Sequence, residues 1–314
     1  MLQIKKTFKR NLDKICDEHY NSIEKYITGR LHLLSKVQQS FIKPKLKEII
    51  TATPIGLFDL NEKYIVHCKG KIKNPKMNLS RVINYSWFSN KETKPYNAFE
   101  LAGKLQVDTC PYCNRNYTVT VGEKSNKIAR PDFDHFYPDK QYPLLALSFY
   151  NLIPSCLICN RTVKNQKIIM AGEYLHPYEE GYDDALAFRY FAKDVDSALG
   201  LDTNIRIRLI ENPIQSTKAS KAMKNAELFK IVEIYQKSHR GEIAELIRKH
   251  HVSSGKYLLG LKQSFPRLGG VDELYRIAFG AYYDADDFEK RPLSKMTKDI
   301  VNQLSFLQPP NSIV

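Results

Sequence analysis

The sequence lacks any long apolar run, and this absence limits the classes of protein to which it can belong. No stretch approaches the ~18 apolar residues of a membrane-spanning helix. The basic residues 1–6 are not followed by the apolar segment of a signal peptide. Internal repeats and low-complexity runs are also missing. We therefore expect a cytoplasmic protein with no membrane partner.

Excess negative charge is missing as well, because the net charge is +14. Residues 1–100 contain 19 Lys and Arg against 9 Asp and Glu, and residues 101–170 contain 9 against 5. Residues 171–314 contain 20 of each sign. The positive excess therefore ends near residue 170, and it indicates phosphate binding or a surface of solvated lysines.

Cysteine is scarce, but four of the six cysteines form two pairs. Cys110 and Cys113 are one C-x2-C pair, and Cys156 and Cys159 are the other, with 42 residues between the pairs. Each such pair can supply two thiolates to a tetrahedral zinc ion. Because no ligand is missing, we expect a closed, structural zinc site that clamps a hairpin to a helix.

Local patterns predict an α+β fold in three regions. Residues 1–105 should be basic and mainly helical, although residues 64–68 could form a strand and Pro44 and Pro54 interrupt the pattern. Residues 106–170 should form the core, with strands at 116–122 and 128–133 and a helix from Cys159. Residues 171–314 should be neutral, with strands at 188–193 and 204–210 and helices from Ser216 onward.

The core region also contains residues suited to phosphodiester hydrolysis. Asp134 and His135 follow a predicted strand, and Asn160 begins the predicted helix. Histidine can take a proton from water near neutral pH. Carboxylate and amide oxygens suit a hard cation such as Mg²⁺ or Mn²⁺. Lys164 and Lys167 could bind phosphate or face solvent, and Arg161 belongs to the same basic segment.

Three sequence blocks in the core region resemble the HNH endonuclease signature in its zinc-stapled form. These blocks are 134–138 (DHFYP), 151–154 (NLIP) and 156–164, which contains the second cysteine pair, Asn160 and Lys164. They occur in the family's order within residues 108–168, about a fifth of the chain. The sequence around these blocks also resembles the HNH nuclease component of Septu-type anti-phage systems.

This resemblance implies a ββα-metal fold and a role for each matching residue. His135 would be the general base, and Asp134 a ligand of the catalytic cation. Asn151 would fix the loop and orient His135. Asn160 stands where many members have His and others Asn, which favours a harder cation. The Septu likeness implies an ATPase partner, for which the neutral C-terminal region could provide the binding surface.

The sequence thus predicts a metal-dependent HNH endonuclease acting on DNA, with Lys164, Lys167 and Arg161 as substrate-binding residues. A zinc-stapled nucleic-acid-binding module without catalysis is the first alternative, although binding alone does not require Asp134 and His135. A catalytic subunit that is inert until a partner activates it is the second.

Overall fold

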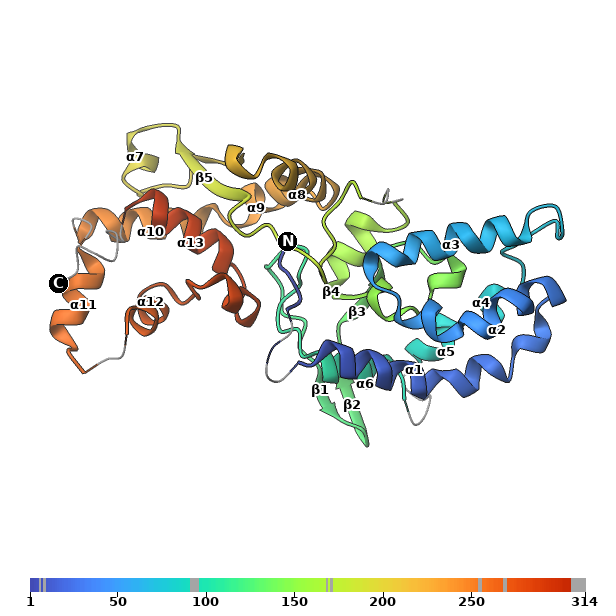
Figure 1. The fold of residues 1–314 in the computed structure, drawn as a ribbon. Helices are drawn as coiled ribbons and strands as arrows, with labels where there is room; N and C mark the ends of the chain where they lie inside the picture. Colours follow the sequence, from blue (N-terminus) through green and yellow to red (C-terminus); the bar gives the residue numbers. More distant parts are fainter. Residues whose placement is uncertain are drawn as a thin grey trace. The chain divides into compact units, whose positions relative to one another are not determined.

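The computed structural model describes residues 1–5, 7, 10–90, 96–167, 169, 172–253, 256–267 and 270–305. It is an α+β protein with small antiparallel sheets (Figure 1). Within the described residues, no helix combines the length and the apolar character needed to cross a membrane.

The chain forms two compact units. The N-terminal unit comprises Gln3–Val107 and Thr118–Glu180, and the C-terminal unit comprises Met1–Leu2, Asp108–Tyr117 and Gly181–Val314. The three ranges expected above, 1–105, 106–170 and 171–314, are a different division based on charge and motifs, and they stay a prediction.

Helices dominate the first part of the N-terminal unit. They are α1 (Leu12–Thr28), α2 (Lys36–Thr51), α3 (Pro54–Cys68), α4 (Leu79–Val82), α5 (Tyr85–Ser89) and α6 (Ala98–Leu105). Helix α1 packs against α2, and α2 against α3. Their facing apolar side chains form a core that contains fully buried Ile23, Ile27, Ile42, Ile49 and Leu57. The helical prediction for residues 6, 8 and 9 lies outside the described residues.

Two expectations for this region were wrong. The proposed strand at 64–68 is the last part of α3, because Leu57, Leu60, Tyr64 and Cys68 form one buried stripe at helical spacing. Pro44 does not interrupt α2 either. It lies on the exposed side, where water can satisfy the carbonyl that loses its hydrogen bond. Pro54 begins α3, the position at which proline is best tolerated.

The strands of the N-terminal unit form two separate pairs. Strand β1 (Val121–Glu123) pairs with β2 (Asn126–Ala129), and β3 (Asp132–His135) pairs with β4 (Leu152–Ser155). The strand predicted at 128–133 is therefore divided near Pro131, which has no N–H to donate. The strand predicted at 116–122 begins only at Val121. The helix predicted from Cys159 is a short π-helix, Ile158–Lys164.

The C-terminal unit combines one strand pair with helices. Strands β5 (Leu186–Ala192) and β6 (Ile205–Glu211) confirm the predicted pair, and β6 alternates buried Ile205 and Ile207 with exposed Arg206 and Arg208. The helices are α7 (Val195–Ala198), α8 (Ser216–Leu228), α9 (Ile231–Ser238), α10 (Arg240–Val252), α11 (Tyr257–Ser264), α12 (Val271–Phe279) and α13 (Ser294–Gln303).

Candidate functional site

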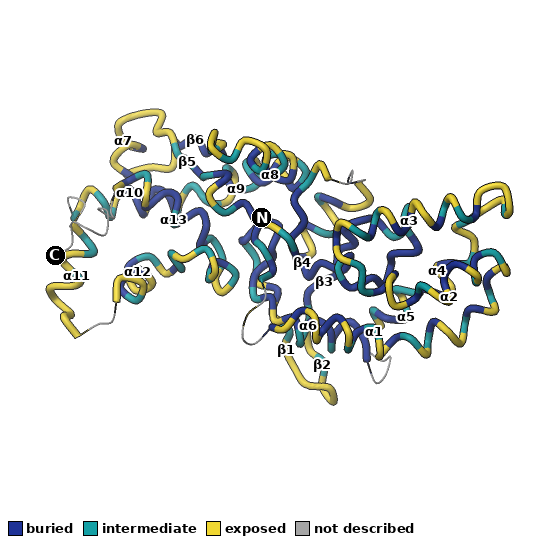
Figure 2. The backbone as a smooth tube through the Cα atoms, viewed as in Figure 1, coloured by how far each residue is buried: buried dark blue, intermediate teal, exposed yellow. Residues whose placement is uncertain are grey.

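The candidate site is built on β3, whose last two residues are Asp134 and His135. Asp134 pairs with Ile153 of β4, and His135 pairs with Leu152. Both strands are almost entirely buried, as the dark blue tube in Figure 2 shows. The pairing fixes the backbone of both candidate residues, and the π-helix follows β4 directly in the chain.

Asn151 holds the loop between these two strands. Its side chain is fully buried. The Oδ1 atom accepts from the Tyr137 amide at 2.8 Å, and Nδ2 donates to the carbonyls of Tyr137 and Leu145 at 3.1 and 2.9 Å. These three bonds satisfy most of the amide, so Asn151 has the geometry of a loop-fixing residue rather than that of a ligand.

His135 lies in a largely apolar setting. Its Nε2 lies 2.9 Å from the carbonyl oxygen of Ala146, and its ring contacts the Tyr85 ring edge to face with centroids 4.5 Å apart. Because a carbonyl only accepts, Nε2 carries the proton and Nδ1 carries the lone pair. Burial lowers the pKa of His135, against smaller opposing effects of Asp139 and the Ala146 carbonyl. The imidazole is therefore neutral at pH 7.

Lys164 occupies a position that the sequence did not reveal. Its side chain is fully buried, and Nζ lies 3.0 Å from Asp134 Oδ1 and 2.6 Å from the His135 carbonyl oxygen. The last residue of the π-helix is thus bound to the end of β3. A lysine in this position is not exposed to a substrate phosphate, whereas Lys167 is exposed.

A second ion pair lies at the start of β3. Arg161 donates Nε to Asp132 Oδ2 at 2.8 Å and Nη2 to Oδ1 at 3.0 Å. Asn160 Nδ2 lies 3.4 Å from the same Oδ2. Asp132 and Asp134 are two residues apart on a strand, so they project to the same face. The π-helix therefore meets this face through Asn160, Arg161 and Lys164.

The residues predicted to bind the catalytic cation, Asp134 and Asn160, are not arranged as a set of metal ligands. Within the described part of the chain, the cysteine cluster is the one group of three or more His, Cys, Asp or Glu arranged to hold a metal ion. Asp134 Oδ1 is engaged by Lys164, and Asn160 turns its amide nitrogen to Asp132. Asp134 and Asn160, as the structure places them, therefore do not form a cation site.

No protein-family model, curated protein or solved structure matches this chain.

The first cysteine pair lies in a tight turn within the C-terminal unit. The amide of Cys110 donates to the Asn116 carbonyl at 2.9 Å, and the amide of Asn114 donates to the Cys110 carbonyl at 2.8 Å. Asn114 adopts a left-handed conformation, with φ of 49°. Such a turn brings two cysteine side chains to one side, as a C-x2-C metal knuckle requires.

Residues far along the chain support this turn. Tyr235 of α9 donates its hydroxyl to the Cys113 carbonyl at 2.6 Å, and Phe229 stacks on Tyr112 with centroids 4.0 Å apart. Asn114 Nδ2 donates to the carbonyl of Phe288 at 3.0 Å. No local pattern in the sequence predicts these partners, because they lie more than 100 residues after the turn.

The second cysteine pair joins β4 to the π-helix. Cys156 follows the last residue of β4, and Cys159 lies in the helix, where the Asn160 amide donates to the Cys156 carbonyl at 3.0 Å. All four cysteines are buried, and their sulfur atoms lie within 4.8 Å of one another. Four sulfurs about 2.3 Å from one zinc ion lie about 3.8 Å apart, so this cluster fits a tetrahedral zinc.

Two other histidines, His176 and His19, are buried in the core. His176 is buried against the Phe136 ring, with centroids 4.1 Å apart, and burial lowers its pKa to about 3. His19 is buried, and its ring nitrogens lie 3.1 Å from the Tyr96 hydroxyl and 2.8 Å from the Leu147 carbonyl oxygen. Both residues therefore remain neutral parts of the core at physiological pH.

Proposed function

We propose that this protein is an HNH-type endonuclease that hydrolyses phosphodiester bonds in DNA. The arrangement of β3, the loop held by Asn151, β4 and the π-helix is the observation that carries the proposal. This order follows that of the three sequence blocks, with Asp134 and His135 at a strand end and Asn160 on the helix. The cysteine cluster supports the proposal, since a structural zinc would fix the π-helix to its surroundings.

His135 is the general base in this proposal. Its neutral imidazole donates Nε2–H to Ala146, which fixes the ring and leaves the lone pair on Nδ1. Nδ1 would take a proton from water as the water oxygen forms a bond to phosphorus. The bond from phosphorus to the leaving oxygen then breaks, and solvent protonates that oxygen. The family resemblance implies a requirement for Mg²⁺ or Mn²⁺. The cleavage assay below tests this requirement by including or omitting each cation.

Cleavage of supercoiled plasmid by the full-length protein tests the proposal. The assay compares wild type, His135→Ala and the matched control His32→Ala, whose histidine is exposed in the same unit, each with Mg²⁺, with Mn²⁺ and with neither. We expect wild type and His32→Ala to cleave, and His135→Ala to lose cleavage while keeping zinc and DNA binding. Equal cleavage by His135→Ala would show that this site is not the nuclease.

The Asp134–Lys164 ion pair favours a second candidate function. Because Lys164 engages the carboxylate that would bind a cation, the isolated chain could be a zinc-stapled nucleic-acid-binding module without catalysis. A related proposal, which rests on the Septu resemblance, is a defence nuclease that an ATPase partner activates. DNA binding without cleavage in every metal condition would support the binding module. Cleavage that appears only with the ATPase would support the activated nuclease.

A further inference from the structure

Strands β1 and β2 form a ribbon that has almost no buried surface. Figure 1 shows this ribbon projecting beyond α6, and Figure 2 shows most of it exposed. Val121 and Ile128 are exposed despite their apolar side chains, and Ile128 is 65% exposed. An isolated two-stranded ribbon is marginally stable in water. Its exposed apolar side chains therefore suggest a surface that is covered by a ligand.

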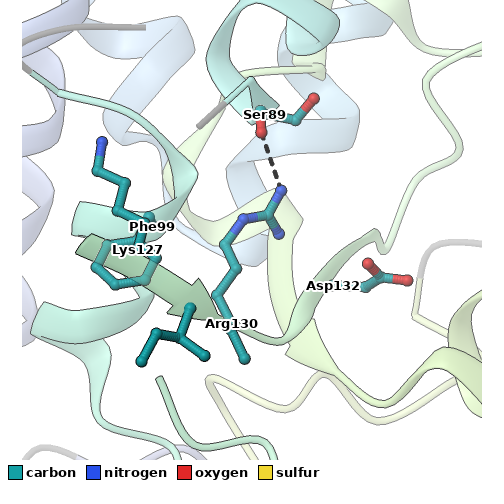
Figure 3. Close-up of a pocket in the computed structure, with 7 residues that line it drawn as sticks. Ser89, Phe99, Lys127, Arg130 and Asp132 are labelled. Carbon is teal, nitrogen blue, oxygen red and sulfur yellow. Dashed lines mark hydrogen bonds between the residues drawn. The ribbon is translucent and has the colours of Figure 1, made fainter. Parts of the chain in front are cut away.

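A pocket of about 300 Å³ opens beside this ribbon within the N-terminal unit. Strand β2 and the residue after it supply Lys127, Ile128 and Arg130, and Phe99 of α6 forms part of the wall. Figure 3 shows the Lys127 side chain extending beside the Phe99 ring, and the ammonium lies 5.8 Å from the ring centroid. The lining thus combines two cations with apolar surface.

Arg130 is held in place by neutral groups. Its Nη1 donates to the Pro131 carbonyl at 2.7 Å, and Nη2 donates to the Ser89 carbonyl at 3.1 Å (Figure 3). Across the described residues, no carboxylate forms a salt bridge with Arg130. The two carbonyls orient the guanidinium without neutralising its charge, as an anion-binding arginine requires.

The pocket also reaches the candidate site. Asp132 lies at its edge, and the same carboxylate accepts hydrogen bonds from Arg161 and Asn160. The bidentate pair with Arg161 compensates the negative charge of Asp132, so this carboxylate does not neutralise Arg130. A strand bound in the pocket would therefore lie beside the start of β3, the strand that ends at His135.

We infer that this pocket binds the phosphodiester backbone of the DNA that the site processes, an inference that rests on the proposed function. Lys127 and Arg130 contact phosphates, and the exposed Ile128 contacts sugars or bases. Gly122 shapes the ribbon, because its φ is +104° and a Cβ there would lie 2.2 Å from the Asn126 carbonyl oxygen. The tight ribbon brings Lys127 to the pocket wall.

The salt dependence of DNA binding tests this inference. Fluorescence anisotropy with a labelled duplex is measured over a range of NaCl concentrations, with full-length His135→Ala as the parent. Adding Lys127→Gln and Arg130→Gln should make the negative slope of log affinity against log salt shallower by about two, because two phosphate contacts are lost. Adding Lys127→Arg and Arg130→Lys should keep the parent slope, which shows that charge is the cause.

The matched control removes two exposed lysines elsewhere in the same unit, with Lys43→Gln on α2 and Lys63→Gln on α3. This control should leave the slope unchanged. A photo-crosslinking amino acid at position 128 should capture the duplex, and the same amino acid at the exposed Ile55 of α3 should not.

An unchanged slope in the glutamine variant, an equal loss in the control, or a parent without salt-dependent binding would each overturn the inference. Plasmid cleavage by wild type is scored separately. If wild type cleaves but the glutamine variant keeps the parent slope, only DNA binding by the pocket is refuted. If the glutamine variant has a shallower slope but wild type does not cleave, only the nuclease activity is refuted.

Discussion

The ammonium of Lys164 lies 3.0 Å from the Oδ1 atom of Asp134, and both side chains are buried. Lys164 also donates to the His135 carbonyl oxygen, so one side chain joins the π-helix to the two candidate catalytic positions. A buried carboxylate without a partner is costly, and this lysine supplies that partner. The same contact occupies the oxygen that a catalytic cation would use.

We predict that Lys164→Met destabilises the protein strongly. The change removes the ammonium that pairs with the buried Asp134 carboxylate, which should lower the free energy of unfolding by about 3–5 kcal/mol. Lys167→Met is the matched control, because Lys167 is exposed, and it should change stability by less than about 0.5 kcal/mol. Urea unfolding monitored by circular dichroism measures both changes.

Adding Asp134→Asn to Lys164→Met removes the uncompensated charge. We expect this double variant to recover part of the lost stability, since a neutral amide costs less to bury than a carboxylate. If the double variant loses as much free energy of unfolding as the two single variants added together, the ion pair does not couple these positions.

The cysteine cluster predicts one tightly bound zinc per chain. Cys113→Ser or Cys156→Ser should abolish zinc binding and lower the melting temperature, because a structural zinc contributes directly to folding. Cys68→Ser is the control for zinc content, because Cys68 lies in α3 and is not one of the four clustered cysteines. Elemental analysis and thermal melting measure both effects. If the wild-type protein lacks zinc, and its melting temperature is the same as with zinc, the prediction is contradicted.

Asn151→Ala should destabilise the loop between β3 and β4. It removes three hydrogen bonds and leaves the buried amide of Tyr137 without a side-chain partner, at a cost of about 1–3 kcal/mol. Asn74→Ala, which removes a hydrogen bond at an exposed turn, should cost clearly less. Plasmid cleavage should fall with Asn151→Ala and persist with Asn74→Ala. A stable and fully active Asn151→Ala protein would refute the loop-fixing role.

Acid should destabilise the N-terminal unit through His19. Burial lowers the pKa of His19 to about 4 from an ordinary value of 6.5. Below pH 6.5 the unfolded chain therefore binds a proton that the folded chain does not. Stability is lost as the pH falls from about 6.5 to 4, by up to about 3 kcal/mol. His19→Gln should make this part of the curve of melting temperature against pH less steep, while buried His176 and His135 still contribute. An unchanged curve would contradict the assignment.

A chain that ends near residue 170 should fail to fold around its first cysteine pair. The turn that contains Cys110 and Cys113 packs against Tyr235 and Phe229. Without them, the shortened protein should lose zinc and become prone to aggregation. A monodisperse, zinc-loaded shortened protein would show that the turn does not need these contacts. The C-terminal region is thus more than a surface for an ATPase partner, a role that stays a prediction.

The sequence by itself determined the features that depend on local pattern and spacing. The cysteine spacing predicted the cluster of four thiols, which the structure brings together within 4.8 Å. The alternation in residues 205–210 predicted β6, because one face of that strand is buried and the other is exposed. The place of Asp134 and His135 at the end of a strand followed from the same kind of pattern.

Only the tertiary structure decided features that depend on contacts far apart in the sequence. Residues 64–68 alternate like a strand, but the buried stripe of α3 includes Leu57 and makes them helical. The spacing of Lys164 suggested an exposed phosphate ligand, but β3 covers its side chain and Asp134 neutralises it. Tyr235 supports Cys113 from more than 100 residues away. Burial and pairing of this kind arise from the packing of whole elements, which no local spacing encodes.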